Sequence, residues 1–322
     1  MSELSARVPV KAPFSFDLAL AYLRGSPSTI VERVDETSYR RAIRLGGGAR
    51  IAILTVRLAP DGNALTATLT GPDLTDTDSA DLVDLVRRLF AVDDDLAEFH
   101  QAIESDSAFL AIARRWPGLR PVIVPDLFET TAWAIIGQQI NIRFAATCKR
   151  ALVEAYGTRV STVDGDYLLF PEADVLAEAR EADLAAIQFS RQKIRYIIGL
   201  SREIAEGRLN LDEIRALPLE AARERLESIV GIGRWTAEYV LMRGVGHRDV
   251  IPAGDGALRR IIGETYGLGR LASEAQVRAV AEAWAGWRGY AAFYLWFTMQ
   301  QESLAKKIAR EKIVPGDPVR RL

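Results

Sequence analysis

The hydrophobic pattern of the first hundred residues predicts both strands and helices. Residues 28–70 are rich in Val, Ile, Thr and Leu that partly alternate with polar residues, which is typical of strands with one buried face. The turn PDGNA separates ARIAILTVRLA from ALTATLT and predicts an antiparallel hairpin. FDLALAYLRG before these strands and DSADLVDLVRRLFAV after them have helical spacing. We therefore expect an N-terminal α+β domain built on an antiparallel β-sheet with helices.

From Asp126 onward, apolar residues recur at the spacing of amphipathic helices. The expected helices are residues 128–140, 141–157, 190–207, 218–230, 234–244, 256–267, 274–287 and 289–310, with a short hairpin around VDGD at 163–166. Between residues 100 and 125, ESDSAF and RPVIVPD interrupt the pattern. We therefore predict an α+β domain over residues 1–105 and a mostly helical domain over residues 106–322.

The composition is that of an ordinary globular protein, with 49% apolar and 26% charged residues. No apolar run reaches the ~18 residues of a membrane span, and the N-terminus lacks the basic-then-apolar order of a signal peptide. We therefore expect a cytoplasmic protein. The single cysteine, Cys148, excludes an iron–sulfur or zinc site held by four cysteines of this chain. With only two histidines, His100 and His247, a protein-ligated transition metal is not expected.

The charge of the chain is unevenly distributed. Its net charge of −2 and pI of about 5.9 argue mildly against nucleic acid as a partner. Counting Asp, Glu, Lys and Arg, however, residues 1–190 sum to −8 and residues 191–322 to +6. A phosphate-bearing partner would therefore dock on the C-terminal part.

The stretch LESIVGIGRWTAEYVLMRG predicts two helices joined by a tight glycine turn, with Ile229, Val230 and Ile232 supplying the apolar contact between them. Gly231 and Gly233 lack a Cβ, so the chain can take positive φ at both and approach another surface closely. The first amides of the second helix have no internal acceptor and suit a phosphate. The alternative is a plain corner between helices, where glycine is the usual cap.

Three aromatic rings can lie beside this turn. Trp235 and Tyr239 are four residues apart and share one face of the second helix, and Trp296 can be brought alongside by the fold. Each ring alone is ordinarily a core residue. Together they can form a slot that holds a flat, electron-poor base by stacking and cation–π attraction. The other aromatic residues considered are assigned to packing, namely Phe128, Trp133, Trp284 and Phe293.

Asp255 follows Gly233 by 22 positions and directly precedes the expected helix GALRRIIG. It is a natural N-cap for that helix, because its carboxylate can accept backbone N–H bonds there. Such bonds also fix the direction of the carboxylate. At a pocket mouth, an oriented carboxylate can stabilise positive charge on a sugar ring or activate water.

These residues resemble the helix-hairpin-helix superfamily of base-excision DNA glycosylases, and within it the DNA-3-methyladenine glycosylase II family. LESIVGIGRWTAEYVLMRG and DVIPAGDGALRR carry the specific part of the resemblance. FETTAWAIIGQQI resembles the glutamine-bearing helix of the family, WAGWRGYAAFYLWF its C-terminal helix and residues 13–100 its N-terminal domain. The resemblance implies a helical core of two subdomains, with the active-site cleft between them.

The resemblance also implies a role for individual residues. Asp255 becomes the catalytic carboxylate, and the walls of the pocket for a flipped base become Trp235, Tyr239, Trp296 and Tyr22. Backbone amides of Gly231, Gly233 and Thr236 would bind a DNA phosphate, and carbonyls of Glu227, Ile229 and Ile232 a monovalent cation. Gln138 and Gln139 would fill the gap left by the extruded nucleotide. Gln139 departs from the family pattern, in which an apolar wedge is common at that position.

The implied activity is hydrolysis of the bond between deoxyribose and an alkylated purine, such as 3-methyladenine or 7-methylguanine, leaving an abasic site. Family members that also cut the strand carry a lysine where this chain has Trp235, and tryptophan cannot form a Schiff base. We expect a monomer that binds double-stranded DNA containing alkylated bases, away from membranes, and needs no cofactor beyond the structural monovalent cation.

Three alternatives remain open at this stage. The first is a glycosylase of the same superfamily that prefers deaminated or oxidised bases. The second is a non-catalytic DNA-binding module in which Asp255 is only a cap, and the third is a generic helical interaction protein. The tail SLAKKIAREKIVPGDPVRRL extends beyond the resemblance, and its basic residues can either contact DNA or end in a solvated, disordered stretch.

Overall fold

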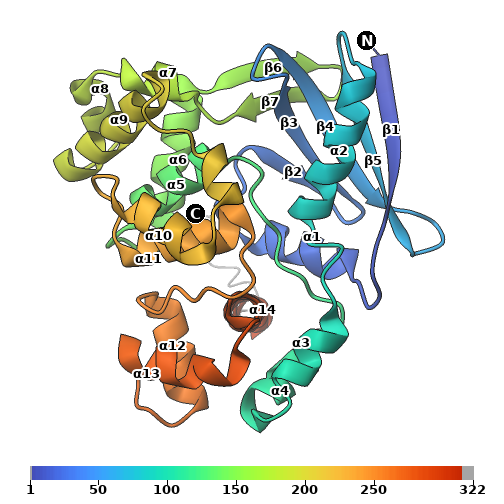
Figure 1. Cartoon of the computed structure of the whole chain (residues 1–322), viewed down its shortest axis with the longest axis vertical. Coiled ribbons are helices and arrows are strands. Elements are labelled where there is room, and N and C mark those ends of the chain that lie inside the picture. Colours follow the sequence, from blue (N-terminus) through green and yellow to red (C-terminus); the bar gives the residue numbers. More distant parts are fainter. Residues whose placement is uncertain (1, 314–322) are drawn as a thin grey trace, which may run out of the picture.

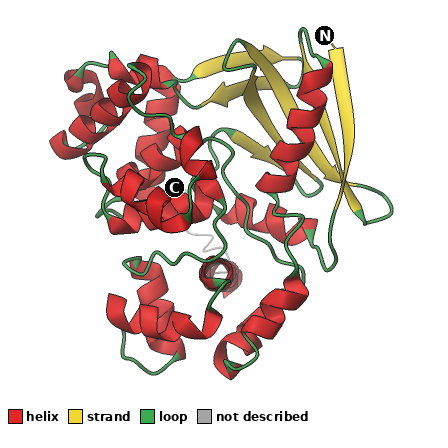
Figure 2. Cartoon of the chain, in the orientation of Figure 1, coloured by secondary structure: helices red, strands yellow, loops and turns green. Residues whose placement is uncertain are grey.

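The computed structural model describes residues 2–313 (Figure 1). Strands gather at one end of the molecule, and helices make up the rest (Figure 2). The overall class is therefore α+β, as predicted. The basic tail after residue 313 lies outside the described residues. Among the described helices, none is long and apolar enough to cross a membrane.

The N-terminal sheet is antiparallel with strand order β1-β5-β4-β3-β2. Its strands are β1 (Ser2–Pro9), β2 (Glu32–Val34), β3 (Ser38–Leu45), β4 (Arg50–Leu58) and β5 (Ala64–Gly71). The hairpin expected around PDGNA is confirmed, since β4 pairs with β5 with Leu58 opposite Leu65. The strand β1 was not expected from the pattern. Most of its residues are exposed, and it pairs with β5 along its whole length.

Alternation along β4 gives the sheet two covered faces. Ala52, Leu54 and Val56 join the core formed with α1 (Phe16–Gly25) and α2 (Asp76–Leu89). The intervening Ile51 and Ile53 pack towards the small hairpin of β6 (Thr158–Thr162) and β7 (Gly165–Leu169). The hairpin predicted around VDGD therefore forms, and docks on the main sheet through β3.

The remaining chain is mostly helical, as the pattern predicts. Its elements are α3 (Leu96–Ala102), α4 (Ser107–Ala113), α5 (Leu127–Gly137), α6 (Ile142–Tyr156), α7 (Ala173–Ala177), α8 (Glu181–Ala186), α9 (Arg191–Ala205), η1 (Asp212–Ala216), α10 (Leu219–Glu227), α11 (Arg234–Val240), η2 (Leu241–Val245), α12 (Gly256–Thr265), α13 (Glu274–Ala281), η3 (Glu282–Trp284) and α14 (Arg288–Ile313). Helices α5 to α11 form one group, and α12, α13, α3 and α4 lie around α14 (Figure 1).

Helix α3 packs with the C-terminal helices although it lies within residues 1–105, the range predicted for the N-terminal domain. The ring of Phe99 lies 5.5 Å from that of Tyr290 and 5.1 Å from that of Tyr294, both on α14. Phe109 of α4 lies 4.9 Å from Trp284 in the same cluster. The division between residues 105 and 106 stays a prediction.

A buried group of charges joins the sheet to the helical part. Glu129 of α5 forms ion pairs with Arg41 of β3 and with Lys149 of α6, the latter at 2.7 Å. Arg41 also pairs with Glu32 of β2 at 3.0 Å. Burial alone would raise the pKa of Glu129, but Arg41 and Lys149 outweigh it and hold the pKa below its usual value. Each charge therefore depends on its partners.

We predict that Glu129→Gln destabilises the protein by about 3 to 5 kcal/mol, because it leaves buried cations uncompensated. Glu172→Gln is the control. It removes the exposed partner of Arg44 and should cost no more than about 1 kcal/mol. The free energy of unfolding in urea, measured at neutral pH, checks both values. Equal and small losses would contradict a structural role for the buried charges.

The same group predicts a pH dependence. Because the pKa of Glu129 is lowered in the folded state, its stabilisation is complete above the pKa of an unfolded glutamate, about 4.3. It is lost as the pH falls through the lower, folded value. The Glu129→Gln variant should therefore lose less stability than the unmodified protein when the pH falls below about 4.3.

Candidate functional site

The turn between α10 and α11 depends on a glycine at one position. Gly231 has φ +94°, and a Cβ there would overlap the ring of Tyr196 on α9. Both facts require glycine at this position. The side chains of Ile229 and Ile232 are buried and hold the two helices together, as expected. Val230, expected to do the same, is 73% exposed, because the turn carries its side chain outward.

Gly233 does not adopt the positive φ that was expected for it. It adopts extended backbone, with φ −92° and ψ 179°, and is the N-cap of α11. A Cβ there would meet no atom within 4 Å, so this side of the turn is open. No side chain caps α11, and its first amides have no acceptor within the helix. An anion can approach these amides past Gly233.

The loop after α5 is tied to this turn through Gln138. Its Nε2 donates to the carbonyl of Gly231 at 2.9 Å and to Oγ1 of Thr236 at 3.0 Å. The side chain of Thr236 is buried, so its hydroxyl acts within the protein and not at the surface. Gln139 is exposed, and its backbone is left-handed, with φ +56°. Of the two glutamines, Gln139 is therefore the one that points towards solvent.

An exposed apolar residue follows Gln139 closely. Ile142, at the start of α6, is 58% exposed, and Val230 projects from the turn to which this loop is bonded. Val230 was expected to be buried between the two helices, and no role was predicted for Ile142. Together they add apolar character to the face that carries the open amides of α11.

The predicted aromatic residues converge in the structure. The ring centroids of Trp235 and Tyr239 are 5.7 Å apart, and those of Tyr239 and Trp296 are 6.0 Å apart. All three side chains are partly exposed, so none is sealed in the core. Trp235 and Tyr239 belong to one helical group and Trp296 to the other (Figure 1). The site therefore forms where the two groups meet.

Asp255 lies beside these rings. One carboxylate oxygen, Oδ1, accepts the backbone N–H of Leu258 at 2.8 Å and the indole N–H of Trp296 at 3.1 Å. The residue is the N-cap of α12, as predicted, and is partly exposed. A Cβ on its neighbour Gly254 would lie 3.5 Å from Cβ of Trp235, so α11 reaches the same place. The carboxylate is thus fixed in direction and borders the rings.

Tyr22, from α1, does not pack with the three rings but shares a cavity with Tyr239. With Trp133, Tyr239 and Arg243 it lines a cavity of about 40 Å³. The indole N–H of Trp133 donates to the hydroxyl of Tyr239 at 3.0 Å. Trp133 is buried, as expected of a packing residue, but it also orients a ring of the site. Burial raises the pKa of Tyr239 to about 12, so its hydroxyl stays neutral.

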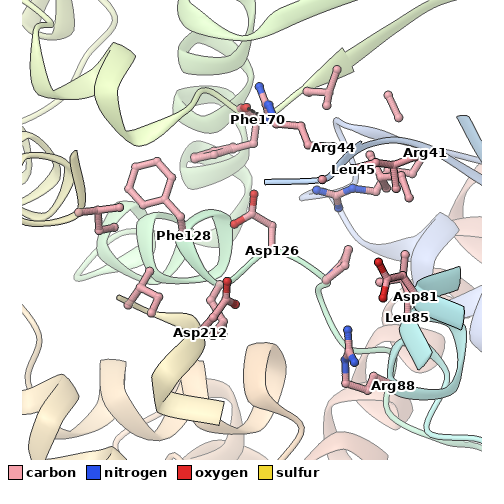
Figure 3. A pocket seen from close by; sticks show the side chains of 18 of the residues that line it. Arg41, Arg44, Leu45, Asp81, Leu85, Arg88, Asp126, Phe128, Phe170 and Asp212 are labelled. Carbon is pink, nitrogen blue, oxygen red and sulfur yellow. Dashed lines mark hydrogen bonds between the residues drawn. The ribbon is translucent and has the colours of Figure 1, made fainter. Parts of the chain in front are cut away.

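A larger cavity, of about 790 Å³, lies elsewhere, between the sheet and the helical part. Figure 3 shows Asp126, Phe128 and Phe170 around it, with Arg44 nearby. Arg44 already bonds Glu172 and the carbonyl of Phe170. None of the predicted site residues lines this cavity. The described residues also contain no group of three or more His, Cys, Asp or Glu side chains able to hold a metal ion.

Comparison with known proteins agrees with this geometry. Residues 132–286 match the model of the HhH-GPD superfamily base excision DNA repair proteins, and residues 5–127 match the AlkA N-terminal domain. The chain is 34% identical to the DNA-3-methyladenine glycosylase of Bacillus subtilis, over 67% of this chain and 71% of that protein. It is 29% identical to DNA-3-methyladenine glycosylase 2 of Escherichia coli, over 89% of this chain and 94% of that protein.

A solved structure shares the whole arrangement. The 3-methyladenine DNA glycosylase from Archaeoglobus fulgidus superposes with a TM-score of 0.79 at 25% sequence identity, over 92% of this chain and 98% of that one. The N-terminal sheet and the helical core therefore occur together in a known protein.

The two glycines of the turn give a matched pair of substitutions. Gly231→Ala should destabilise the protein by about 2 to 4 kcal/mol, because it adds a left-handed alanine and a clash with Tyr196. Gly233→Ala should cost less than about 1 kcal/mol, since its backbone is extended and its surroundings are open. Urea unfolding measures both. Equal losses would show that the turn does not have this geometry.

Proposed function

This chain belongs to the AlkA-type DNA-3-methyladenine glycosylases of the HhH-GPD superfamily, and we propose that Asp255 is its catalytic carboxylate. As a member of that family it binds DNA and removes alkylated bases. The observation that carries the assignment of Asp255 is its position. The residue bonds Trp296, one of three aromatic rings that lie together, and a capping role alone would not require this.

The rings suit an alkylated purine. Alkylation at N3 or N7 makes the base cationic and electron-poor, so it binds the faces of Trp235, Tyr239 and Trp296 by stacking and cation–π attraction. A cationic base is also a good leaving group. A general acid is then unnecessary, which fits a site whose described residues provide rings and a carboxylate but no histidine.

The carboxylate supplies the remaining chemistry. As the bond to the base breaks, positive charge develops on the deoxyribose, and Asp255 stabilises it and directs a water molecule to the sugar carbon. The bonds from Leu258 and Trp296 hold the carboxylate in place without reorganisation. Trp235 follows Arg234 where a lysine would form a Schiff base, so the product is an abasic site in an uncut strand.

DNA binding falls to the turn and the loop beside it. The open amides at the start of α11 would hold a backbone phosphate, and Gln139 would enter the space left by the flipped nucleotide. Gln138 would support this loop through its bonds to the turn. The chain would act as a monomer on duplex DNA containing alkylated bases.

The carbonyl oxygens of Glu227, Ile229 and Ile232 fit a monovalent cation. That of Ile229 accepts the N–H of Ile232 at 3.0 Å, and those of the other two accept no hydrogen bond within residues 2–313. Neutral oxygens that lack donors are free to coordinate an ion. A cation bound there would attract a DNA phosphate through its charge.

We predict that Asp255→Asn lowers release of 3-methyladenine at least a hundredfold, because the charge that stabilises the sugar is removed. Binding to the same duplex should change by no more than a few-fold. Asp95→Asn, which alters the N-cap of α3, is the control and should retain activity. Single-turnover base release from methylated DNA measures the loss. Excision at the original rate by Asp255→Asn would refute the catalytic role.

The cation can be tested by exchange. When sodium and potassium are replaced by tetramethylammonium at constant ionic strength, we expect weaker binding to an abasic-site duplex, because that ion is too large for the three carbonyls. A return to full affinity on adding potassium would support the ion. Unchanged affinity across all three salts would show that no monovalent ion contributes.

A further inference from the structure

Arg243 is a buried cation with unsatisfied hydrogen-bond donors. It lies in the π-helical turn η2, four residues after Tyr239, and is 5% exposed. Its Nε and Nη1 atoms have no hydrogen-bond partner among the described residues. Burying donors of a charged group without acceptors is costly. π-Helical turns inside helices are also frequent at functional sites.

Other buried arginines of the structure have acceptors for the ends of their guanidinium groups. Arg41 pairs with Glu32 and Glu129. The Nη atoms of Arg120 donate to backbone carbonyls of Lys11, Pro13, Ala91 and Asp94. These arginines join segments of the fold. Arg243 differs, because its Nε and Nη1 atoms donate to no acceptor among the described residues and so do not join segments of the fold.

Arg243 lines a cavity that shares one ring, that of Tyr239, with the site. This is the 40 Å³ cavity that Tyr22 and Trp133 also line. Its lining includes charged residues that are ion-paired within the buried group described above, namely Glu32, Glu129 and Lys149. Its guanidinium lies 5.0 Å from the ring centroid of Tyr22 and 5.1 Å from that of Phe293. The cavity is large enough for an exocyclic atom of a base or for a few waters, but not for a whole purine.

Tyr239 connects this cavity to the catalytic side. Its ring packs beside Trp235 and Trp296, and its hydroxyl is bonded to Trp133 in the cavity lining. Asp255 is bonded to Trp296, and neither residue lines this cavity. A purine whose sugar is held at Asp255 would therefore direct its edge remote from the sugar towards Arg243.

We propose that Arg243 is a specificity-determining residue that donates a hydrogen bond to a carbonyl oxygen on the remote edge of the flipped base. The inference rests on the proposed function of this site. It names alkylated guanine, together with other 6-oxopurines, as the substrate class that the cavity recognises.

Guanine and adenine differ in the group that they carry at position 6. Guanine carries an oxygen acceptor at position 6, whereas adenine carries an amino donor there. A guanidinium has only donors, so it matches guanine and opposes adenine. Its charge adds to this effect. It strengthens the hydrogen bond to the oxygen of a 6-oxopurine, whereas it repels the cationic rings of 3-methyladenine and 7-methylguanine alike, so the group at position 6 makes the difference.

The test is the ratio of two bases released from one sample of methylated DNA. Arg243→Met removes the donors and the charge while keeping a long apolar stem, and we expect 7-methylguanine release to fall about tenfold to a hundredfold. Release of 3-methyladenine should stay the same or rise. Arg243→Lys keeps a donor and the charge, and should lose less 7-methylguanine release than the methionine variant does.

Release of hypoxanthine separates the effect of a hydrogen bond donated by Arg243 from the effect of its positive charge. This base has the same oxygen at position 6 but is neutral, so its release should fall with that of 7-methylguanine in Arg243→Met. A parallel loss of all three bases, or an unchanged ratio, would overturn the proposal and leave Arg243 a structural residue. Equal behaviour of the lysine and methionine variants would also count against it. If the unmodified protein released no alkylated base, the proposed function itself would fail, which is a separate result.

Discussion

The hydrogen bond from the indole of Trp296 to Asp255 is the contact on which the site depends. It joins the long helix α14 to the N-terminus of α12, and the same carboxylate oxygen caps α12. The bond fixes a ring wall and the carboxylate relative to each other. Trp235 lies on the same side, since a Cβ on Gly254 would be 3.5 Å from Cβ of Trp235. The geometry for charge stabilisation thus exists before any substrate binds.

The N-terminal domain contributes to the site as well as to the fold. Tyr22 sits on α1, which is held against α14 by a bond from Gln300 to the carbonyl of Tyr22 at 3.1 Å. Gly25 allows that approach, since a Cβ there would meet the Gln300 side chain. The buried ion pairs of Glu129 join the sheet to α5, which ends at the loop bearing Gln139. Loss of this junction would therefore disturb the loop that bears Gln139.

The sequence patterns predicted the features that depend on interactions between residues near one another in the chain. The β4–β5 hairpin, the helices and the capping role of Asp255 follow from turn chemistry and periodicity, and all are present. Strand β1 was missed because only its pairing with β5 makes it a strand. Arg243 was missed for a similar reason. It reads as one polar residue in a helical stretch, and its burial beside Tyr22 arises from a tertiary contact more than two hundred positions away in sequence.

Two electrostatic requirements apply around Tyr239, and together they explain why aromatic rings line the site. A cationic base must be attracted, but a buried arginine lies behind one of the walls. A carboxylate between the rings would attract the cationic base, but it would also pair with Arg243 and so remove the discrimination between bases. Rings attract a cation through their faces without carrying charge. In our proposal Asp255 acts at the sugar and Arg243 at the remote edge of the base, so bond cleavage and base selection act at opposite ends of the same purine.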